Sequence, residues 1–295
     1  MFDPNEEPAR CEQYLSRFLG GQVDFLRAER LTQSTREAPW RLDVYLNGMA
    51  QSYVLQLDSS DQEHEYLVLK AMEAIPIPIP RAYGLDLQGE ALGEACFFED
   101  FIAGESLLGP MQIGEAWAEE LFINSVCSLN AVKDEDLGDL AHGLKRHSAH
   151  DALEGSYASL NGRSLPILDA AYRELNAGMP TLPALRFSNG DLWLDNFIIH
   201  DKKLAGIIDF EGAMFSDPIY EFLLSFFVSP VLQGHGTEAR YCERIGYDPA
   251  ILNWYHGLEY FEVLCWALLS GKGFVHHTAD SLQADLKKWL NDIHS

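Results

Sequence analysis

Two aspartates and an asparagine in the C-terminal half of the chain are spaced as a phosphoryl-transfer site requires. Asp191 follows a glycine in a predicted loop, Asn196 stands five residues later, and Asp209 follows an apolar hairpin pattern. A loop aspartate can accept the proton of an attacking hydroxyl, while an asparagine and a second aspartate can hold one divalent metal ion. Asp191 alone would more often be a turn or cap residue. Its spacing to Asn196 and Asp209 favours catalysis.

The segments around these residues are predicted from their apolar periodicity. In the N-terminal third, alternating strands flank an Asn-Gly turn, and a Pro-rich segment must be an extended connector because alternate residues lack an N–H donor. The expected elements there are a helix over 6–19, strands over 41–46 and 52–57, a helix over 62–74, the connector over 75–80 and a strand over 95–99. Helical periodicity then predicts helices over 113–129, 167–175, 218–228, 249–269 and 279–293.

Composition bounds the class of protein. The chain has 295 residues, of which 47% are hydrophobic, and its formal net charge is -24. That charge disfavours nucleic acid and anionic membranes as partners, and no apolar run reaches the roughly 20 residues of a membrane span. The first residues lack the pattern of a secretory signal, so a cytoplasmic protein is expected. The five cysteines are too scattered to predict a zinc site or a disulfide framework.

The excess of 45 acidic over 21 basic residues allows two interpretations. A negative field attracts a cationic, amine-bearing small molecule, and it also keeps a protein soluble with no bearing on substrate. Both remain open. The carboxylates considered for binding an amino group are Glu221, Glu259 and Glu262 on the predicted C-terminal helices.

With these elements in order, the chain resembles the aminoglycoside phosphotransferase and choline kinase-like family, which has the protein-kinase-like fold. The resemblance covers about 27–269. The segment 189–196 is similar to the family's His-Gly-Asp-x-x-x-x-Asn signature, 208–211 to Ile-Asp-Phe/Trp-Glu, and 216–218 to Gly-Asp-Pro. The Ile-Pro-Ile-Pro-Arg segment over 77–81 resembles its Val-Pro-Val-Pro-Arg connector.

The resemblance implies an α+β fold with two lobes, a small antiparallel β-sheet lobe and a larger, mainly helical lobe. It places a nucleotide-binding lobe at 1–100, a hinge at 101–104, and a helical lobe with the catalytic loop and acceptor pocket at 105–295. It also implies that ATP and Mg²⁺ are the cofactors and that the partner is a small-molecule hydroxyl acceptor.

Roles follow residue by residue from the same resemblance. Asp191 becomes the catalytic base, and Asn196 and Asp209 become the Mg²⁺ ligands. The residues placed at the nucleotide are Gln56 and Glu65 near the phosphates, Ser34 in the phosphate-covering loop, and Asp100 and Ile102 at the adenine edge. Asp217 is expected to support the catalytic loop rather than to touch substrate.

Several positions depart from the family pattern. Gln56 stands where a lysine or arginine is expected, so Glu65 loses its cationic partner, and the loop over 32–35 contains no glycine. Asn130 and Asn189 stand where the family carries histidines. One missing cation would cost about 2–4 kcal/mol of transition-state stabilisation, which slows a reaction without abolishing it.

The sequence therefore predicts an ATP-dependent, Mg²⁺-requiring phosphotransferase acting on a small-molecule hydroxyl. Two alternatives stay open. One is a catalytically impaired, kinase-like binding or regulatory protein, and the other is a phosphotransferase that uses GTP.

Overall fold

A computed structural model describes residues 2–31, 39–57, 62–163, 165–229, 232 and 235–294. Ser34, predicted to contact the nucleotide, lies outside these residues, as does the glycine-free loop. The chain forms two compact units, each assembled from separated stretches of sequence. Unit 1 contains 1–106, 134–143 and 196–213, and unit 2 contains 107–133, 144–195 and 214–295.

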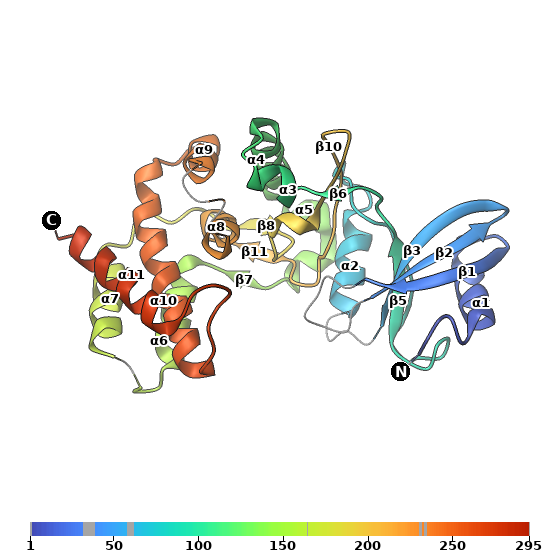
Figure 1. Ribbon diagram of the computed structural model, residues 1–295, viewed down its shortest axis with the longest axis horizontal. Helices are drawn as coiled ribbons and strands as arrows, with labels where there is room; N and C mark the ends of the chain where they lie inside the picture. The colour runs from blue at the N-terminus through green and yellow to red at the C-terminus, as the bar shows by residue number, and fades with distance from the viewer. Residues whose placement is uncertain are drawn as a thin grey trace. The chain divides into compact units, whose positions relative to one another are not determined.

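Unit 1 is built on a five-stranded antiparallel sheet in the order β1-β2-β3-β5-β4 (Figure 1). Its strands are β1 (Val23–Arg30), β2 (Trp40–Leu46), β3 (Met49–Leu57), β4 (Ala82–Asp86) and β5 (Cys96–Asp100). The predicted Asn47-Gly48 turn joins β2 to β3, with φ of 51° and 79° at these residues. Positive φ at both central residues is the geometry that makes Asn-Gly the favoured two-residue hairpin turn.

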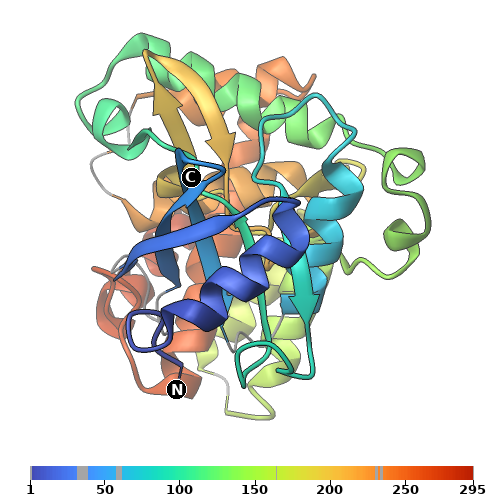
Figure 2. The same ribbon diagram turned by 90° about the vertical axis from the view of Figure 1, so that its right-hand side faces the viewer.

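Two helices cover this sheet. Helix α1 (Pro8–Leu19) lies across the strands, as Figure 2 shows, and ends at Gly20 in the left-handed conformation. Its Tyr14 ring meets Phe98 edge-on, with 5.4 Å between ring centroids. Helix α2 (Gln62–Met72) buries Val68, Leu69 and Met72. Short helical turns near α2 are α5 (Asp134–Leu137) and η1 (Gly138–His142).

A second, three-stranded sheet of unit 1 carries residues of the predicted metal site. It pairs β6 (Glu105–Ser106) with β9 (Phe197–His200), and β9 with β10 (Lys203–Ile207). The 3₁₀ turn η2 (Leu194–Asn196) leads into β9. The backbone N–H of Ile207 donates to the carbonyl of Pro78 at 2.9 Å. The Pro-rich connector therefore anchors the β9–β10 hairpin within unit 1.

Unit 2 is mainly helical and has one small sheet. Its helices are α3 (Leu108–Gln112), α4 (Ala116–Asn130), α6 (Ala149–Ser159), α7 (Pro166–Ala177), α8 (Pro218–Val228), α9 (Thr237–Arg244), η4 (Pro249–Ile251), α10 (Leu252–Ser270) and α11 (Ala279–Asp292). The sheet has the order β7 (Arg146–His147), β11 (Met214–Ser216), β8 (Arg186–Ser188). Helix α10 forms the centre of the core and packs against α6, α7, α8 and α11.

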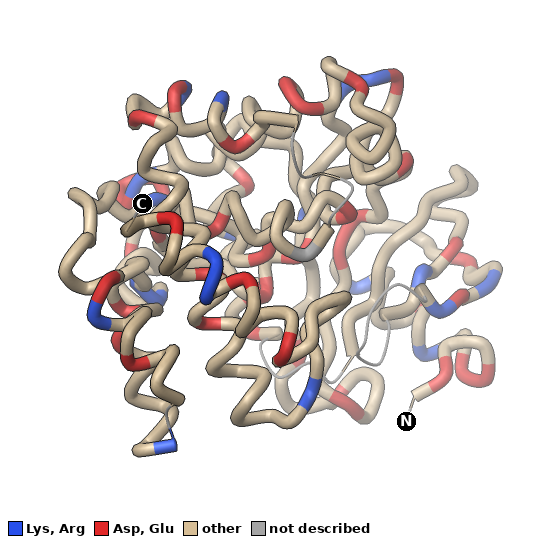
Figure 3. The backbone as a smooth tube through the Cα atoms, turned by 60° about the vertical axis from the view of Figure 1, so that its left-hand side comes forward, with Lys and Arg blue, Asp and Glu red and all other residues tan. Residues whose placement is uncertain are grey.

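The five predicted C-terminal helices are present, and one boundary differs clearly. The helix expected from 113 begins at Ala116 because Gly114 has a φ of 72°, which a continuous right-handed helix excludes. Helices α6 and α9 were not predicted. Within the described residues, no helix is long and apolar enough to cross a membrane. Figure 3 shows acidic residues along both units, interspersed with fewer basic ones.

Candidate active site

The β9–β10 hairpin brings the two predicted metal ligands, Asn196 and Asp209, to the same end of a hairpin. Phe197 pairs with Ile207 in this hairpin, so the residues flanking that pair lie at its open end. The N–H of Ile208 donates to the carbonyl of Asn196 at 2.9 Å, and Asn196 is buried. Asn196 and Asp209 are distant in sequence, and the pairing of β9 with β10 brings their backbones to the same end of the hairpin.

Asp209 holds a backbone conformation that costs free energy. Its φ is 62°, in the left-handed region that residues other than glycine enter uncommonly. Such a conformation costs on the order of 1 kcal/mol and persists where the surrounding structure enforces it, often at functional sites. Here α2 supplies part of that enforcement through contacts to the residues that follow Asp209.

Glu65 of α2 is one of those contacts. Its carboxylate accepts a hydrogen bond from the backbone N–H of Phe210 at 3.2 Å, and its side chain is buried. His64, the preceding residue, lies 2.9 Å from the carbonyl of Ala213 through its Nε2. The glutamate that was expected to lose its cationic partner therefore contacts the backbone directly after the predicted metal ligand.

Gln56 on β3 has a different acidic partner. Its side-chain amide donates to Oε1 of Glu99, on the adjacent strand β5, at 3.3 Å. Burial and the nearby carboxylate of Glu65 raise the pKa of Glu99 well above its usual range, and the charge of Asp209 acts in the same direction. The amide of Gln56 thus contacts the carboxyl group of Glu99, whose raised pKa favours the protonated form. Sequence reasoning missed Glu99.

Introducing a cation at this position tests what Gln56 contacts. We expect Gln56→Lys to tighten the binding of Mg²⁺-AMP-PNP by about tenfold, because a charge-assisted hydrogen bond to a phosphate replaces a neutral one. Isothermal titration calorimetry measures the affinity. Gln56→Met, which has no donor, is the control for a change in packing. Unchanged or weaker affinity in the lysine variant would mean that another residue meets the phosphates.

The predicted hinge residues lie on β5 and just after it. The backbone N–H of Asp100 donates to the carbonyl of Arg81 at 3.0 Å, and its carboxylate accepts from the Tyr83 hydroxyl at 3.2 Å. The side chain of Ile102 lies against the Cα of Gly206 on β10, where a Cβ would collide with it. Ile102 thus packs on the hairpin that carries the predicted metal ligands.

The donor set suits a magnesium ion that is shared with phosphates. In the described part of the chain, no three His, Cys, Asp or Glu side chains form a ready-made metal cage. Magnesium does not need one, because it keeps several waters and is usually bound through one or two protein oxygens and the phosphates of its substrate. Asn196 and Asp209, whose backbones lie at one end of the hairpin, carry oxygen donors of the kind that such a site needs.

In unit 2, the loop that carries Asp191 is held by side chains on either side of it. Asn189, fully buried, donates its amide to the carbonyl of Asp191 at 2.9 Å. The hydroxyl of Ser188 accepts from the N–H of Gly190 at 3.1 Å, and Gly190 has a φ of 81°. Asn130 donates to the carbonyl of Phe187 at 3.1 Å. Both asparagines that replace the family histidines therefore support this loop.

Asp191 lines a cavity of about 310 Å³ within unit 2. The other residues that line it are Leu192, Trp193, Leu224, Ser225, Phe274 and Val275. This volume lies in the range of small-molecule sites. A carboxylate at a cavity of that size can accept a proton from a bound hydroxyl compound.

Glu221 of α8 is a buried carboxylate close to Asp191. Burial, together with the negative charge of Asp191, raises the pKa of Glu221 to about 7. Its Oε2 lies 3.5 Å from the hydroxyl of Ser188, which also accepts a hydrogen bond from the N–H of Gly190 in the loop of Asp191. Glu221 thus contacts the loop through Ser188 and does not line the cavity.

The raised pKa of Glu221 makes folding stability depend on pH. The folded state favours the protonated carboxyl, so its contribution is fully present below pH 4.5 and is lost as the pH rises to about 7. We expect Glu221→Gln to reduce the loss of stability between pH 4.5 and 7 by on the order of 3 kcal/mol. Denaturant unfolding at both pH values measures it, with Glu243→Gln on the exposed face of α9 as control. An equal loss in wild type and Glu221→Gln would contradict the assignment.

Asp217 supports the fold as expected, although through a helix rather than the loop itself. One carboxylate oxygen caps the N-terminus of α8 by accepting from the N–H groups of Ile219 and Tyr220 at 3.0 and 3.2 Å. The other accepts from the Tyr255 hydroxyl at 2.7 Å. Burial raises the pKa of Asp217 to about 6.

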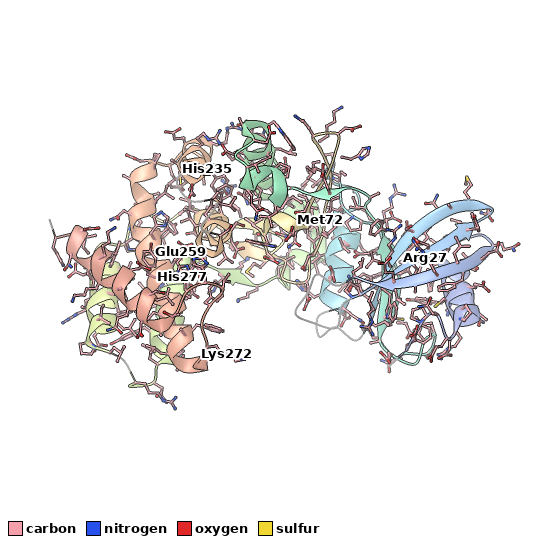
Figure 4. The ribbon with its side chains drawn as sticks, viewed as in Figure 1. Arg27, Met72, His235, Glu259, Lys272 and His277 are labelled. Atoms are coloured by element: carbon pink, nitrogen blue, oxygen red, sulfur yellow. The ribbon has the colours of Figure 1, made fainter. Side chains whose placement is uncertain are left out.

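The two remaining carboxylates considered for an amino group lie in other contacts. Glu259 is buried on α10, labelled in Figure 4, and its Oε2 lies 3.3 Å from Nδ1 of His256. Glu262 contacts the Tyr220 hydroxyl, and burial raises its pKa to about 7. Neither lines the cavity at Asp191.

The antiparallel sheet of unit 1, the hairpin with its two oxygen donors, and the helical unit around Asp191 define a kinase-like phosphotransferase fold. The family model for the phosphotransferase enzyme family matches residues 36–255. The chain belongs to this family. A comparison with curated protein sequences found no match.

Solved structures agree on the fold. A candidate aminoglycoside phosphotransferase from Ralstonia eutropha is similar with a TM-score of 0.72, at 15% identity over 99% of each chain. A thermostable mutant of APH(4)-Ia in a ternary complex with AMP-PNP and hygromycin B gives 0.65, at 16% identity over 95% of this chain and 97% of that one. A choline/ethanolamine kinase family protein from Mesorhizobium loti gives 0.60, at 16% identity over 90% and 88%.

Proposed function

We propose that this protein is an ATP-dependent, Mg²⁺-requiring phosphotransferase that phosphorylates a hydroxyl group of a small molecule. The observation that carries the proposal is the hairpin that holds Asn196 and Asp209 at one end, with Asp209 in a left-handed conformation. An oxygen pair fixed in this way suits a metal bound to nucleotide phosphates. The AMP-PNP complex of a structural relative supports the choice of ATP.

The chain's own residues divide the work between the two units. In unit 1, Asn196 and Asp209 would hold the metal, which would offset the charge of the phosphates, and Glu65 keeps the backbone after Asp209 in place. Gln56 offers a neutral donor to a phosphate, and the backbone at Asp100 and Ile102 meets the adenine. In unit 2, Asp191 accepts the hydroxyl proton, and Asn189 fixes the loop that presents it. Catalysis then rests on positioning and on charge compensation.

The direct test is nucleotide-dependent transfer. Purified protein with Mg²⁺ and ATP is incubated with a panel of hydroxyl compounds, ADP is quantified, and the phosphorylated product is identified by mass spectrometry. We expect acceptor-dependent ADP formation that EDTA abolishes. The same panel with GTP tests the alternative donor. ADP formation that no acceptor stimulates, with no phosphorylated product, would contradict the proposal.

A second candidate is a kinase-like binding or regulatory protein without turnover. The observation in its favour is Gln56, which offers no charge to the phosphates and contacts Glu99. Thermal stabilisation by Mg²⁺-ATP with no transfer to any acceptor would support this candidate.

A further inference from the structure

The cavity at Asp191 has almost entirely apolar walls. Leu192, Trp193, Leu224, Phe274 and Val275 contribute aliphatic or aromatic side chains. The hydroxyl of Ser225 donates to the carbonyl of Leu192 at 2.5 Å, so it is committed to the backbone. Of the described residues that line the cavity, Asp191 alone has an ionisable side chain. The cavity therefore combines one carboxylate with an apolar surface.

Two of these apolar side chains are left in contact with water. Leu224 on α8 is 40% exposed and Val275 is 72% exposed. Exposed apolar side chains are ordinary when isolated, but a group of them at a cavity marks a binding surface. Covering such a surface with an apolar ligand removes it from water and so favours binding.

The backbone at Val275 is in a strained conformation. Its φ is 53°, which is an outlier for a β-branched residue. Glycine or asparagine would fit this turn with less strain. Strain of this kind is concentrated at functional sites. A water-exposed valine in this conformation does little for folding, so its side chain points to a role in binding.

His277 fixes the turn that carries Val275. The backbones of Phe274 and His277 exchange two hydrogen bonds, at 2.9 and 2.8 Å. The ring of His277 stacks on Phe227 of α8 with 4.5 Å between centroids, and its Nε2 lies 3.2 Å from the carbonyl of Phe227. Figure 4 labels His277 beside α8 and α10. The turn is thus a pre-formed part of the wall.

We propose that the acceptor is a neutral hydroxyl compound with an apolar body, in contrast to a cationic amine. Its hydroxyl lies at Asp191 and its body against Leu224, Phe274 and Val275. This inference rests on the proposed function. In the reaction, a bond forms between the acceptor oxygen and the γ-phosphorus of ATP, the bond to the β-phosphate oxygen breaks, ADP leaves, and the hydroxyl proton passes to Asp191.

Charge at the wall supports the same class of acceptor. A cationic acceptor is best recognised by carboxylates that pair with its charge. Glu221, Glu259 and Glu262 instead make buried contacts with Ser188, His256 and Tyr220. Of the described residues that line this cavity, Asp191 therefore supplies the one acidic side chain, and the acidity of the chain as a whole adds no second carboxylate to the wall.

Binding is measured by isothermal titration calorimetry, with naphthylethanol as the apolar alcohol and choline as the cationic one. We expect naphthylethanol to bind at least about tenfold more tightly than choline. Leu224→Glu should weaken the binding of naphthylethanol by about tenfold or more. Leu224→Met keeps the apolar volume, so its affinity for naphthylethanol should stay within about threefold of the wild-type value. Tighter binding of choline, or no effect of Leu224→Glu, would overturn the inference.

Val275→Gly separates binding from folding. It removes the side chain from the wall and relieves the strained backbone, so we expect an unchanged or higher Tm together with naphthylethanol binding about three- to tenfold weaker. Unchanged affinity in this variant would overturn the role of Val275. Failure of the two proposals remains distinguishable. Tight naphthylethanol binding without phosphorylation contradicts the proposed function alone, whereas phosphorylation of choline in preference to naphthylethanol contradicts the inference alone.

Discussion

Asp191→Asn should lower kcat for phosphoryl transfer by about 10³-fold or more while leaving the affinity for Mg²⁺-ATP within about threefold. A positioned base contributes about 10² to 10⁴ to the rate, and the amide of asparagine cannot accept the hydroxyl proton. We expect nucleotide affinity to be retained because Asp191 lines the cavity that we propose for the acceptor. Steady-state kinetics with the best acceptor measures kcat, and titration calorimetry measures the affinity.

The matched control for this variant is Asp248→Asn in the same unit. Asp248 caps η4 by accepting from the N–H of Ala250 at 2.9 Å, and asparagine caps equally well, so kcat should not change. Asp191→Asn should also lower the pKa of Glu221, because the charge of Asp191 raises it. Loss of nucleotide binding in Asp191→Asn would assign this residue to the phosphates and contradict its role as base.

Asp209→Asn should abolish the thermal stabilisation that Mg²⁺-ATP gives to the wild type, and with it the transfer activity. The substitution removes the anionic ligand, and a hard cation then keeps one neutral amide, from Asn196, and a second at residue 209. We expect the affinity for Mg²⁺-ATP to fall by about 100-fold, which removes about 3 kcal/mol of ligand-dependent stabilisation at saturating nucleotide. A thermal-shift titration at millimolar nucleotide measures the effect.

Asparagine suits this test because it tolerates the left-handed backbone that Asp209 adopts, with φ of 62°. The apo fold should therefore be retained. Asp201 provides the matched control, since it is also an aspartate with positive φ, 50°, but lies exposed at the tip of the β9–β10 hairpin. Asp201→Asn should leave the thermal shift unchanged. If Mg²⁺-ATP raised the Tm of Asp209→Asn as much as it raises that of the wild type, the assignment of Asp209 as a metal ligand would be wrong.

The elements with strong local signals were predicted correctly from sequence. Asn47 and Gly48 are residue types that adopt positive φ readily, and they form the predicted turn. Helix α8 begins at Pro218 and ends at Val228, as Pro218 and the apolar run after it predict. The kinase-like fold is confirmed by the family match and by the structural relatives. Local rules suffice where neighbours in sequence decide the conformation.

Features that depend on contacts between distant residues could not be predicted. The hydrogen bond from Gln56 to Glu99 joins neighbouring strands, and no spacing along the chain shows that Glu99 faces Gln56. The cavity wall combines the loop of Asp191, α8 and the turn at Val275. A valine carries no sequence signal for a left-handed turn, which glycine or asparagine would have given. The roles of Asp191, Asn196 and Asp209 stay predictions until they are measured.

The two asparagines that hold the loop of Asp191 do not change charge near neutral pH. Asn130 and Asn189 hold the loop through amide hydrogen bonds to backbone carbonyls, at positions where the resemblance places histidines. A histidine there would acquire a proton close to pH 6.5, and an amide does not. Mild acidification therefore leaves these two supports intact, and the response of this loop to acid depends on its carboxylates, Glu221 foremost.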